Sequence, residues 1–453
     1  MCALINSAGT QGFSGSSHNI GEAKGKHLWL YVLMFAIGAL RSIDVSLVGR
    51  VSLAEVLAFG ACPFLLASSK IRFSCKAFYT CFFVLVLMFV GVVVSDLVNK
   101  NFFWFSARSF ARPVFMFGFF VFFLAVLTRS HFSLVPMVYG SVISGIIKYF
   151  RPSDFEVSGA QFVDSYAGFV FRVQPLITAV ALSAIIFIYP RSRLLALLCF
   201  LGAGLSIAVF GGARSSILIW LAAAAVLGAI ILMKSSNRRR MTINRSRLFL
   251  LSSALVIALS ILYGVYVYAA PRGLLGEDQL VKFESQSNNR FGSTPWGLIL
   301  SGRAQVYGAI LGILDRPILG FGSWRHDLTQ VYVYDAISDV GSDSQVLSNL
   351  AQGGRISGAG HSVIFQAWVE NGFLPAMCLI FVFVIFARVF VFYIKYENRL
   401  TPYIVYLFFS FCWAFFFSPP GLGLRFQAGL IFAIYVVFIS KRGLRRSINS
   451  LSR

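Results

Sequence analysis

The stretch AFYTCFFVLVLMFVGVVVSDLV, residues 77–98, decides the fold class, because it is long enough to cross a membrane and holds a single charged residue, Asp96. A helix of about 20 apolar residues spans the hydrocarbon of a bilayer. The whole chain has the same character: 58% of its residues are hydrophobic, 12% are charged, and the mean hydropathy is +0.78. A soluble globular protein is usually far more polar. The sequence therefore predicts an all-α, polytopic integral membrane protein with one helical membrane domain.

Similar apolar runs recur along the chain, and together they predict about twelve transmembrane helices. The predicted spans are 28–40, 51–67, 77–98, 110–128, 133–150, 171–189, 193–210, 215–233, 247–269, 362–387, 402–417 and 424–440. The chain divides accordingly into a polar leader (1–27), a first set of nine spans (28–270), a large loop (271–360), three further spans (361–440) and a basic tail (441–453).

Basic residues predict the orientation of these spans. They concentrate in alternate connections, above all in NRRRMTINRSR (237–247) and KRGLRR (441–446). By the positive-inside rule these connections and both termini are expected in the cytoplasm, with the leader disordered and without a signal peptide. The net charge of +22 then reflects topology and attraction to anionic lipid. Nucleic-acid binding is disfavoured, because the basic runs are short and lie beside spans.

The loop 271–360 is the longest connection and is expected on the outer side, where long connections usually carry function. Its segment SGRAQVYGAILGILDRPILGFGSW (301–324) predicts an amphipathic helix with Val306, Ile310 and Leu314 on one face. Asp315–Pro317 should end that helix, and Gly320–Gly322 should form a tight turn. Residues 331–360 are polar and show no core-forming pattern, which predicts a mobile lid, a ligand-contacting surface or a disordered spacer.

Six arginines fall at or beside the outer ends of predicted spans. They are Arg108, Arg112, Arg172, Arg214, Arg303 and Arg425. A guanidinium at the centre of a membrane helix costs roughly 2.5–3.5 kcal/mol, so such residues usually mark a function. The alternative is that each side chain reaches into the headgroup region. As a set they predict a clamp for phosphate, which the planar guanidinium binds through two parallel hydrogen bonds.

Two histidines, His326 and His361, are expected on the outer side. His361 directly precedes an apolar run, so it should lie at the N-terminal end of a helix. The positive helix end and nearby arginines both disfavour imidazolium, and a neutral imidazole can accept a proton. His361 is therefore the candidate general base, with a structural hydrogen-bonding role as the alternative. Glu370 falls on the opposite helix face and is not expected to be its partner.

No metal or cofactor is expected. The seven cysteines all fall in predicted spans or cytoplasmic segments. The sequence contains no HExxH zinc motif and no Walker-type phosphate loop. These observations argue against a metalloprotease and against an ATP-driven pump.

Three motifs, taken in order, resemble the bacterial O-antigen ligase and polymerase superfamily. FGGARSS (210–216) comes first, the segment 301–324 follows in the large loop, and GHSVIFQAWVENGFLP (360–375) opens the next span. The likeness covers residues 165–440, and the first half of the chain fits by hydropathy alone. It implies a GT-C-like glycosyltransferase architecture in the bacterial inner membrane. Members transfer a glycan from undecaprenyl diphosphate to an acceptor hydroxyl at the periplasmic face, with inversion and without a metal.

The same resemblance assigns catalytic roles. Arg214 and Arg303 take the diphosphate-binding positions of the family, and His361 takes the position of the base. Arg172 resembles a further recurrent arginine, and with Arg425, Arg108 and Arg112 it is predicted to bind substrate. One departure is that Ser362 follows His361 where the family often has asparagine; a serine can still cap the helix.

The function expected from this resemblance is polymerisation of an O-antigen or exopolysaccharide. The acceptor would be a second lipid-linked glycan, and a chain-length regulator or an export protein would be a partner, in addition to membrane lipid. An O-antigen ligase of lipopolysaccharide biosynthesis, which transfers the glycan to lipid A core, would need the same residues. A lipid-linked sugar flippase is the alternative from another class, but it should carry charge along a central cavity rather than on one face.

Overall fold

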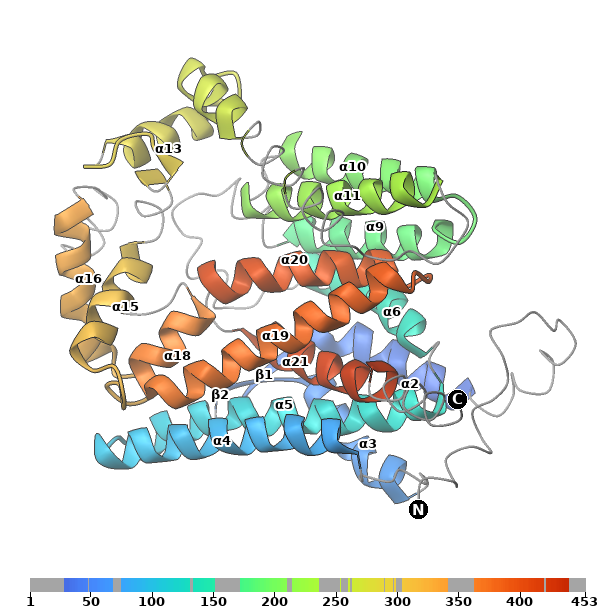
Figure 1. The fold of residues 1–453 in the computed structure, drawn as a ribbon, viewed down its shortest axis with the longest axis horizontal. Helices are drawn as coiled ribbons and strands as arrows, with labels where there is room; N and C mark the ends of the chain where they lie inside the picture. The colour runs from blue at the N-terminus through green and yellow to red at the C-terminus, as the bar shows by residue number, and fades with distance from the viewer. Residues whose placement is uncertain are drawn as a thin grey trace, which may run out of the picture.

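The computed structural model describes residues 28–47, 49–67, 75–130, 133–150, 172–209, 214–235, 253, 260, 263–288, 290–295, 297–298, 304–340, 362–418 and 421–439. Within these residues the protein is all-α except for one two-stranded hairpin. Most of the helices lie along a common direction in a bundle (Figure 1). The bundle helices are α2 (Leu28–Ala39), α3 (Leu53–Ala67), α4 (Lys76–Val98), α5 (Phe103–Arg129), α6 (Leu134–Phe150), α9 (Gln174–Ile188), α10 (Arg193–Val209), α11 (Arg214–Ser235), α19 (Phe373–Lys395), α20 (Thr401–Phe417) and α21 (Leu422–Ile434), which continues as η6 (Tyr435–Ile439).

Shorter elements lie at one end of the bundle, on the left in Figure 1. They are η5 (Ala270–Arg272), α13 (Glu277–Ser287), α15 (Ala304–Asp315), α16 (His326–Val340) and α18 (Val363–Asn371). We call this end, which carries α15, α16 and α18, the outer end after its predicted orientation, and the opposite end the inner end. Apart from Ala270, which begins η5, the outer elements come from the predicted large loop and from the residues that directly follow it.

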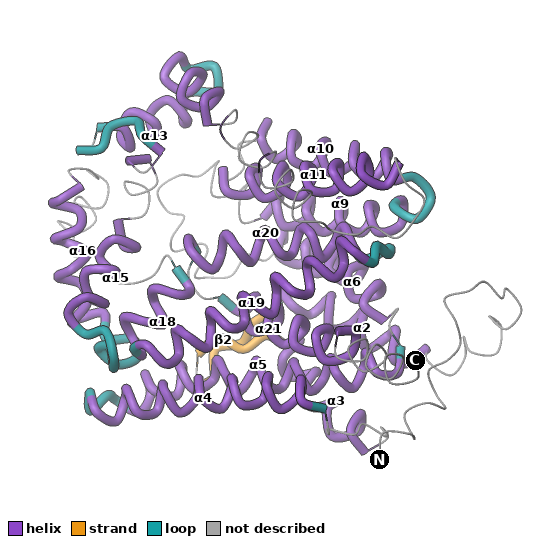
Figure 2. The backbone as a smooth tube through the Cα atoms, viewed as in Figure 1, coloured by secondary structure: helices purple, strands orange, loops and turns teal. Residues whose placement is uncertain are grey.

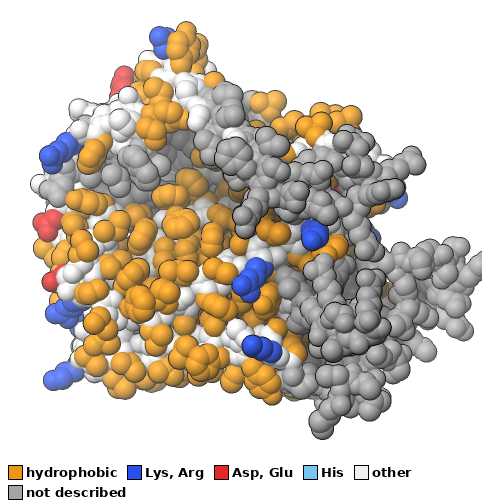
Figure 3. Space-filling view, in the orientation of Figure 1, with side chains coloured by type: hydrophobic (Ala, Val, Ile, Leu, Met, Phe, Trp, Pro, Cys, Tyr) orange, Lys and Arg blue, Asp and Glu red, His pale blue; other side chains and the backbone are white. Residues whose placement is uncertain are grey.

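Four helices are long and apolar enough to cross a membrane: α4, α5, α19 and, within α11, Ser215–Leu232. Shorter apolar helices accompany them, so the chain is a multi-pass membrane protein. Figure 3 shows a broad apolar surface on one side of the bundle. The exposed apolar side chains of the bundle include Phe83, Phe89, Val90 and Val94 of α4 and Met377, Val384 and Val391 of α19. Lipid is the environment that such a surface requires.

The helices agree with most of the predicted spans. The span predicted over 77–98 is α4, Lys76–Val98, and those predicted over 193–210 and 402–417 are α10 and α20. The predicted span 247–269 lies almost entirely outside the described residues, as do the leader 1–27 and the tail 441–453. The number of about twelve spans therefore stays a prediction.

The single span predicted over 362–387 is instead two helices, α18 and α19, separated at Gly372. Gly372 has φ 81°, and a Cβ atom there would lie 2.0 Å from the carbonyl oxygen of Ile318. The next residue, Phe373, donates its N–H to the same oxygen at 3.0 Å. A residue with a side chain would therefore prevent the segment around Ile318 from packing here, and glycine permits both the turn and the contact.

A hairpin that the hydropathy pattern did not predict joins α2 to α3. Its strands β1 (Asp44–Leu47) and β2 (Gly49–Ser52) are antiparallel, with Val45 opposite Val51. Helix α2 has 12 residues and rises only about 18 Å, less than the ~30 Å of bilayer hydrocarbon. The chain therefore enters the hairpin before it reaches the end of the bundle. Figure 2 shows the two strands, in orange, among the helices.

The outer helices confirm one prediction and correct two. Helix α15 ends at Asp315, and Gly320 and Gly322 have positive φ, as the sequence predicts for the helix end and the turn. The buried face of α15, however, is formed by Val306, Ala309 and Ile313, while Leu314 is exposed. Gly308 and Gly312 lie on the same face and allow α16 and α18 to approach α15 closely. Because glycine has no side chain, the spacing of apolar side chains does not reveal this contact face.

The second correction concerns the first part of 331–360, where no core-forming pattern was predicted. Residues 331–340 belong to α16, and Val333, Ala336 and Ile337 are buried at helical spacing. In VYVYDAISDV, polar residues separate the apolar ones, so the helical spacing is not obvious from the sequence. The segment nevertheless forms a helix with one apolar face, and the helix packs on α15. Residues 341–360 lie outside the described part of the chain.

Candidate functional site

The predicted catalytic residues lie at the margins of what the structure describes. His361 and Arg303 are outside the described residues. Arg214 is the first residue of α11, but its side chain is not described. Arg172 is exposed, just before α9. The structure does show the helices that follow two of these residues directly in the chain, α15 after Arg303 and α18 after His361.

Helix α18 begins as the sequence predicts. Ser362 is its N-cap, and the Ser362 hydroxyl oxygen accepts the backbone N–H of Phe365 at 3.3 Å. The same hydroxyl donates to the carbonyl oxygen of Phe415, in α20, at 3.0 Å. The prediction that a helix starts directly after His361 is thus confirmed, and so is the capping role of Ser362.

Helices α15 and α18 pack against each other at the outer end. Ala309 and Ile313 of α15 form a buried cluster with Val369 of α18 and Phe321. In Figure 1 both helices run from upper N-terminal ends to lower C-terminal ends. Beyond these ends, Phe373 donates its N–H to the carbonyl oxygen of Ile318 at 3.0 Å. The segments that follow Arg303 and His361 are therefore neighbours in the fold, although they are far apart in the sequence.

A buried acidic residue, Glu370, lies near the C-terminal end of α18. Arg112 of α5 is buried and interacts electrostatically with Glu370. The Glu370 carboxylate also accepts the side-chain amide N–H of Gln366 at 2.8 Å. The attraction between these two buried charges favours the ionised form of the Glu370 carboxyl group.

A second buried acid, Asp96, binds the segment before α16 to the end of α4. Asp96 accepts the backbone N–H of Ser323 at 2.7 Å, and the Ser323 hydroxyl lies 2.9 Å from both Asp96 Oδ2 and Asn371 Oδ1. Asn101 donates to Asp96 at 3.0 Å and to the carbonyl oxygen of Ser323 at 2.7 Å. The guanidinium of Arg108 lies 5.7 Å from the centroid of the Trp324 ring.

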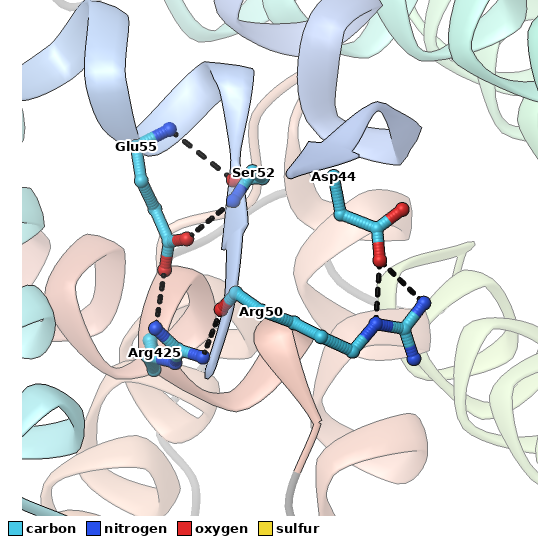
Figure 4. A network of polar contacts seen from close by, with 5 residues as sticks. All are labelled: Asp44, Arg50, Ser52, Glu55 and Arg425. Carbon is cyan, nitrogen blue, oxygen red and sulfur yellow. Dashed lines mark hydrogen bonds and ion pairs between the residues drawn. The ribbon is translucent and has the colours of Figure 1, made fainter. Parts of the chain in front are cut away.

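A third polar group surrounds the hairpin (Figure 4). Arg425 of α21 lies 3.2 Å from the carboxylate of Glu55 and donates to the carbonyl oxygen of Arg50 at 2.9 Å. Glu55 accepts the N–H of Ser52 at 2.7 Å, and the Ser52 hydroxyl accepts the N–H of Glu55 at 3.2 Å. This reciprocal pair is a capping box, which starts α3. Arg50 in turn pairs with Asp44 across the hairpin.

The outer helices are joined by one further polar contact. The Tyr332 hydroxyl of α16 donates to the carboxylate of Asp315 at the end of α15. Burial and this hydrogen bond, together with the negative charge of Asp315, raise the pKa of Tyr332 to about 12. The phenol therefore stays protonated and keeps donating at neutral pH.

Two of the four arginines predicted to bind substrate thus have carboxylates as neighbours. Arg425 faces Glu55 and Arg112 faces Glu370. Glu55 was not among the predicted site residues, although Ser52-x-x-Glu55 is the sequence pattern of a capping box. Nothing in the sequence brings Glu370 to Arg112, because the two residues come from distant segments.

Within the described part of the chain, no group of three or more His, Cys, Asp or Glu side chains is placed to hold a metal ion. No protein-family model matches the sequence, and a search of curated proteins finds no match. The resemblance to the O-antigen ligase and polymerase superfamily therefore stays a prediction from the three motifs and their order.

Proposed function

We propose that the protein is a glycosyltransferase of the bacterial inner membrane that polymerises an O-antigen or exopolysaccharide at the periplasmic face. Its donor is a glycan on undecaprenyl diphosphate, and its acceptor is a hydroxyl group of a second glycan. What supports this most directly is the packing of α15 against α18, because these helices directly follow Arg303 and His361. About twelve spans in a GT-C-like arrangement would present this region to the periplasm.

The chemistry needs a base and a site for a departing anion. His361 takes the proton of the acceptor hydroxyl as its oxygen attacks the anomeric carbon. The bond between that carbon and the diphosphate oxygen breaks, and Arg303 and Arg214 stabilise the charge that develops on the leaving group. A pair of carboxylates like that of a glycosidase is unnecessary, because the diphosphate is already an activated leaving group.

The remaining arginines divide into two groups. Arg108 and Arg172 have no carboxylate contact among the described residues, and we assign them to the diphosphate or to lipid headgroups. Arg112 and Arg425 each face a buried carboxylate, so they offer less positive charge to a ligand. We assign these two to holding the helices in place.

The proposal is tested with purified protein and undecaprenyl-diphosphate oligosaccharide as donor. The wild type should transfer glycan to acceptor and should keep its activity in EDTA. His361→Ala should lower kcat on the order of 10²–10⁴-fold. Arg303→Lys should keep only part of the activity, because an ammonium lacks the planar fork that binds phosphate. No transfer by the wild type, or a His361→Ala protein at full rate, would refute the proposal.

A deletion strain identifies the acceptor. Loss of a polymerase leaves one repeat unit attached to the core, whereas loss of a ligase leaves bare core with lipid-linked polymer. The second outcome would show that the acceptor is lipid A core. Accumulation of donor on the cytoplasmic face would instead indicate a flippase.

A further inference from the structure

The segment LDRPI, residues 314–318, ends α15 and leaves two large apolar side chains exposed. Leu314 and Ile318 are each 74% exposed, although the segment belongs to the loop that was predicted to lie outside the membrane. We call residues 314–318 the outer turn. We infer that the outer turn lies in the membrane leaflet at the outer end, with Leu314 and Ile318 among the acyl chains and with Arg316 and Lys100 bound to the phosphate groups of anionic phospholipid.

Hydrogen bonds fix the outer turn to the end of α4. Asn99, which directly follows α4, donates from its side-chain amide to the carbonyl oxygen of Gly320 at 3.3 Å. The amide oxygen of Asn99 accepts from the guanidinium of Arg316, also at 3.3 Å. The Ser95 hydroxyl, in the last turn of α4, donates to the carbonyl oxygen of Leu319 at 2.6 Å. The outer turn therefore lies beside the point where α4 ends.

The outer turn is fixed in the same way to the beginning of α19. Phe373, the first residue of α19, donates its N–H to the carbonyl oxygen of Ile318 at 3.0 Å. The indole N–H of Trp368, in α18, donates to the carbonyl oxygen of Pro317 at 2.7 Å. Helices α4 and α19 also pack against each other. The outer turn thus lies across the outer ends of two helices that are long enough to cross the membrane.

The exposed apolar sides of these two helices lead to the outer turn. On α4 the exposed apolar residues recur every three or four positions, at Phe83, Val86, Val90, Val94 and Leu97. On α19 they are Phe373, Met377, Val384 and Val391. Leu97 is close to Asn99, and Phe373 is bonded to Ile318, so each series reaches the outer turn. Figure 3 shows the apolar surface extending to the outer end, on the left. The surface that requires lipid therefore continues onto Leu314 and Ile318.

Charge at this level fits a phospholipid surface. Helix α4 has 23 residues and is about 34 Å long, so its end reaches the boundary of the ~30 Å hydrocarbon layer. Lys100 and Arg316 are exposed there, and Arg316 has further N–H donors besides the one that Asn99 accepts. The acidic neighbour, Asp315, accepts the hydroxyl of Tyr332. Cations beside exposed apolar side chains match a leaflet, which offers phosphates and acyl chains at the same boundary.

The test measures depth in the bilayer with the fluorophore nitrobenzoxadiazole on single cysteines. The full-length, otherwise cysteine-free protein is placed in phosphatidylcholine nanodiscs. The fluorophore on Ile318→Cys should be quenched by lipid that carries a nitroxide near its headgroup. On Val86→Cys, near the middle of α4, a nitroxide deep in the acyl chain should quench more strongly. Val331→Cys is the matched control, an exposed apolar position on α16, which lies further outward in Figure 1 and should not be quenched.

A second comparison tests the phosphate contacts through the charge of the lipid. The nitroxide near the headgroup is carried on phosphatidylglycerol or on phosphatidylcholine, at equal mole fraction. Phosphatidylglycerol should quench the fluorophore on Ile318→Cys about two-fold more strongly, because lysine and arginine near the surface attract anionic lipid. Addition of Arg316→Gln and Lys100→Gln should abolish this preference but keep the quenching by phosphatidylcholine. Addition of Lys76→Gln, an exposed lysine at the other end of α4, should leave the preference unchanged.

Two outcomes would contradict the inference. A fluorophore on Ile318→Cys that stays as unquenched as on Val331→Cys would overturn it and would assign the exposed apolar side chains to a protein partner. Equal quenching by the two lipids, with Arg316 and Lys100 present, would reject the phosphate contacts. If Ile318→Cys does not fold, Leu314→Cys takes its place with the same measurements. None of them requires glycan transfer, so the result is independent of the proposed function.

Discussion

Arg425 and Glu55 are charged residues inside the bundle, and each compensates the charge of the other. Their side chains are 14% and 1% exposed, and the ion pair joins α21 to the first turn of α3. The hairpin completes the arrangement, because Arg425 also donates to the carbonyl oxygen of Arg50. Such a pair adds little stability compared with well-packed apolar residues, but removal of one partner leaves the charge of the other buried and uncompensated. Its value is that it specifies where α21 meets the hairpin.

We therefore expect Arg425→Ala to lower the free energy of unfolding by about 3–5 kcal/mol, because Glu55 is left buried without its cation. The double variant Arg425→Met/Glu55→Gln should recover most of this loss. Arg50→Ala is the control: Arg50 is 40% exposed in its pair with Asp44, and such pairs contribute about 0–1 kcal/mol. Thermal unfolding in detergent, followed by tryptophan fluorescence, measures all three. A double variant as unstable as Arg425→Ala would contradict this account.

Elements were predictable where the sequence pattern is uniform. Helix α4 could be placed within one residue, because a long apolar run without breakers has one interpretation. The break between α18 and α19 was not found, although Asn371-Gly372 followed by Pro375 is a turn signal, since the run stays apolar across it. The packing of α15 was missed for a related reason, because its contact face is built around glycines. The proximity of Arg112 to Glu370 depends on the tertiary fold alone.

The packing of α2 against α6 requires their backbones to approach closely at Gly140. A Cβ atom on Gly140 would lie 2.1 Å from the carbonyl oxygen of Phe35 in α2. Gly140→Ala should therefore force the helices apart and lower stability by roughly 1–3 kcal/mol or more, as overpacking does. Gly202→Ala in α10 meets nothing within 4 Å and should be neutral or stabilising by up to ~1 kcal/mol. Equal melting temperatures for the two variants would show that α2 and α6 are not packed this closely.

At the scale of the whole molecule, the two ends of the bundle differ in chemistry. The outer end carries the polar groups around Glu370 and Asp96, while the group around Glu55 lies at the hairpin, within the length of the bundle. The connection between α9 and α10 lies at the inner end (Figure 1), where Arg193 pairs with Glu397. The distribution of lysine and arginine over the sequence predicts that the inner end faces the cytoplasm.

Single cysteines decide the orientation. In a background with all seven cysteines replaced, Ser287→Cys, at the end of α13, should react with a membrane-impermeant maleimide in cells whose outer membrane has been permeabilised. Ser192→Cys, in the connection between α9 and α10, should react only after the inner membrane is broken. The reason is that α13 and this connection lie at opposite ends of the bundle, so one bilayer must separate them (Figure 1). If Ser192→Cys reacted while the inner membrane was intact and Ser287→Cys did not, the orientation would be the reverse of the predicted one. The candidate site would then lie on the cytoplasmic side.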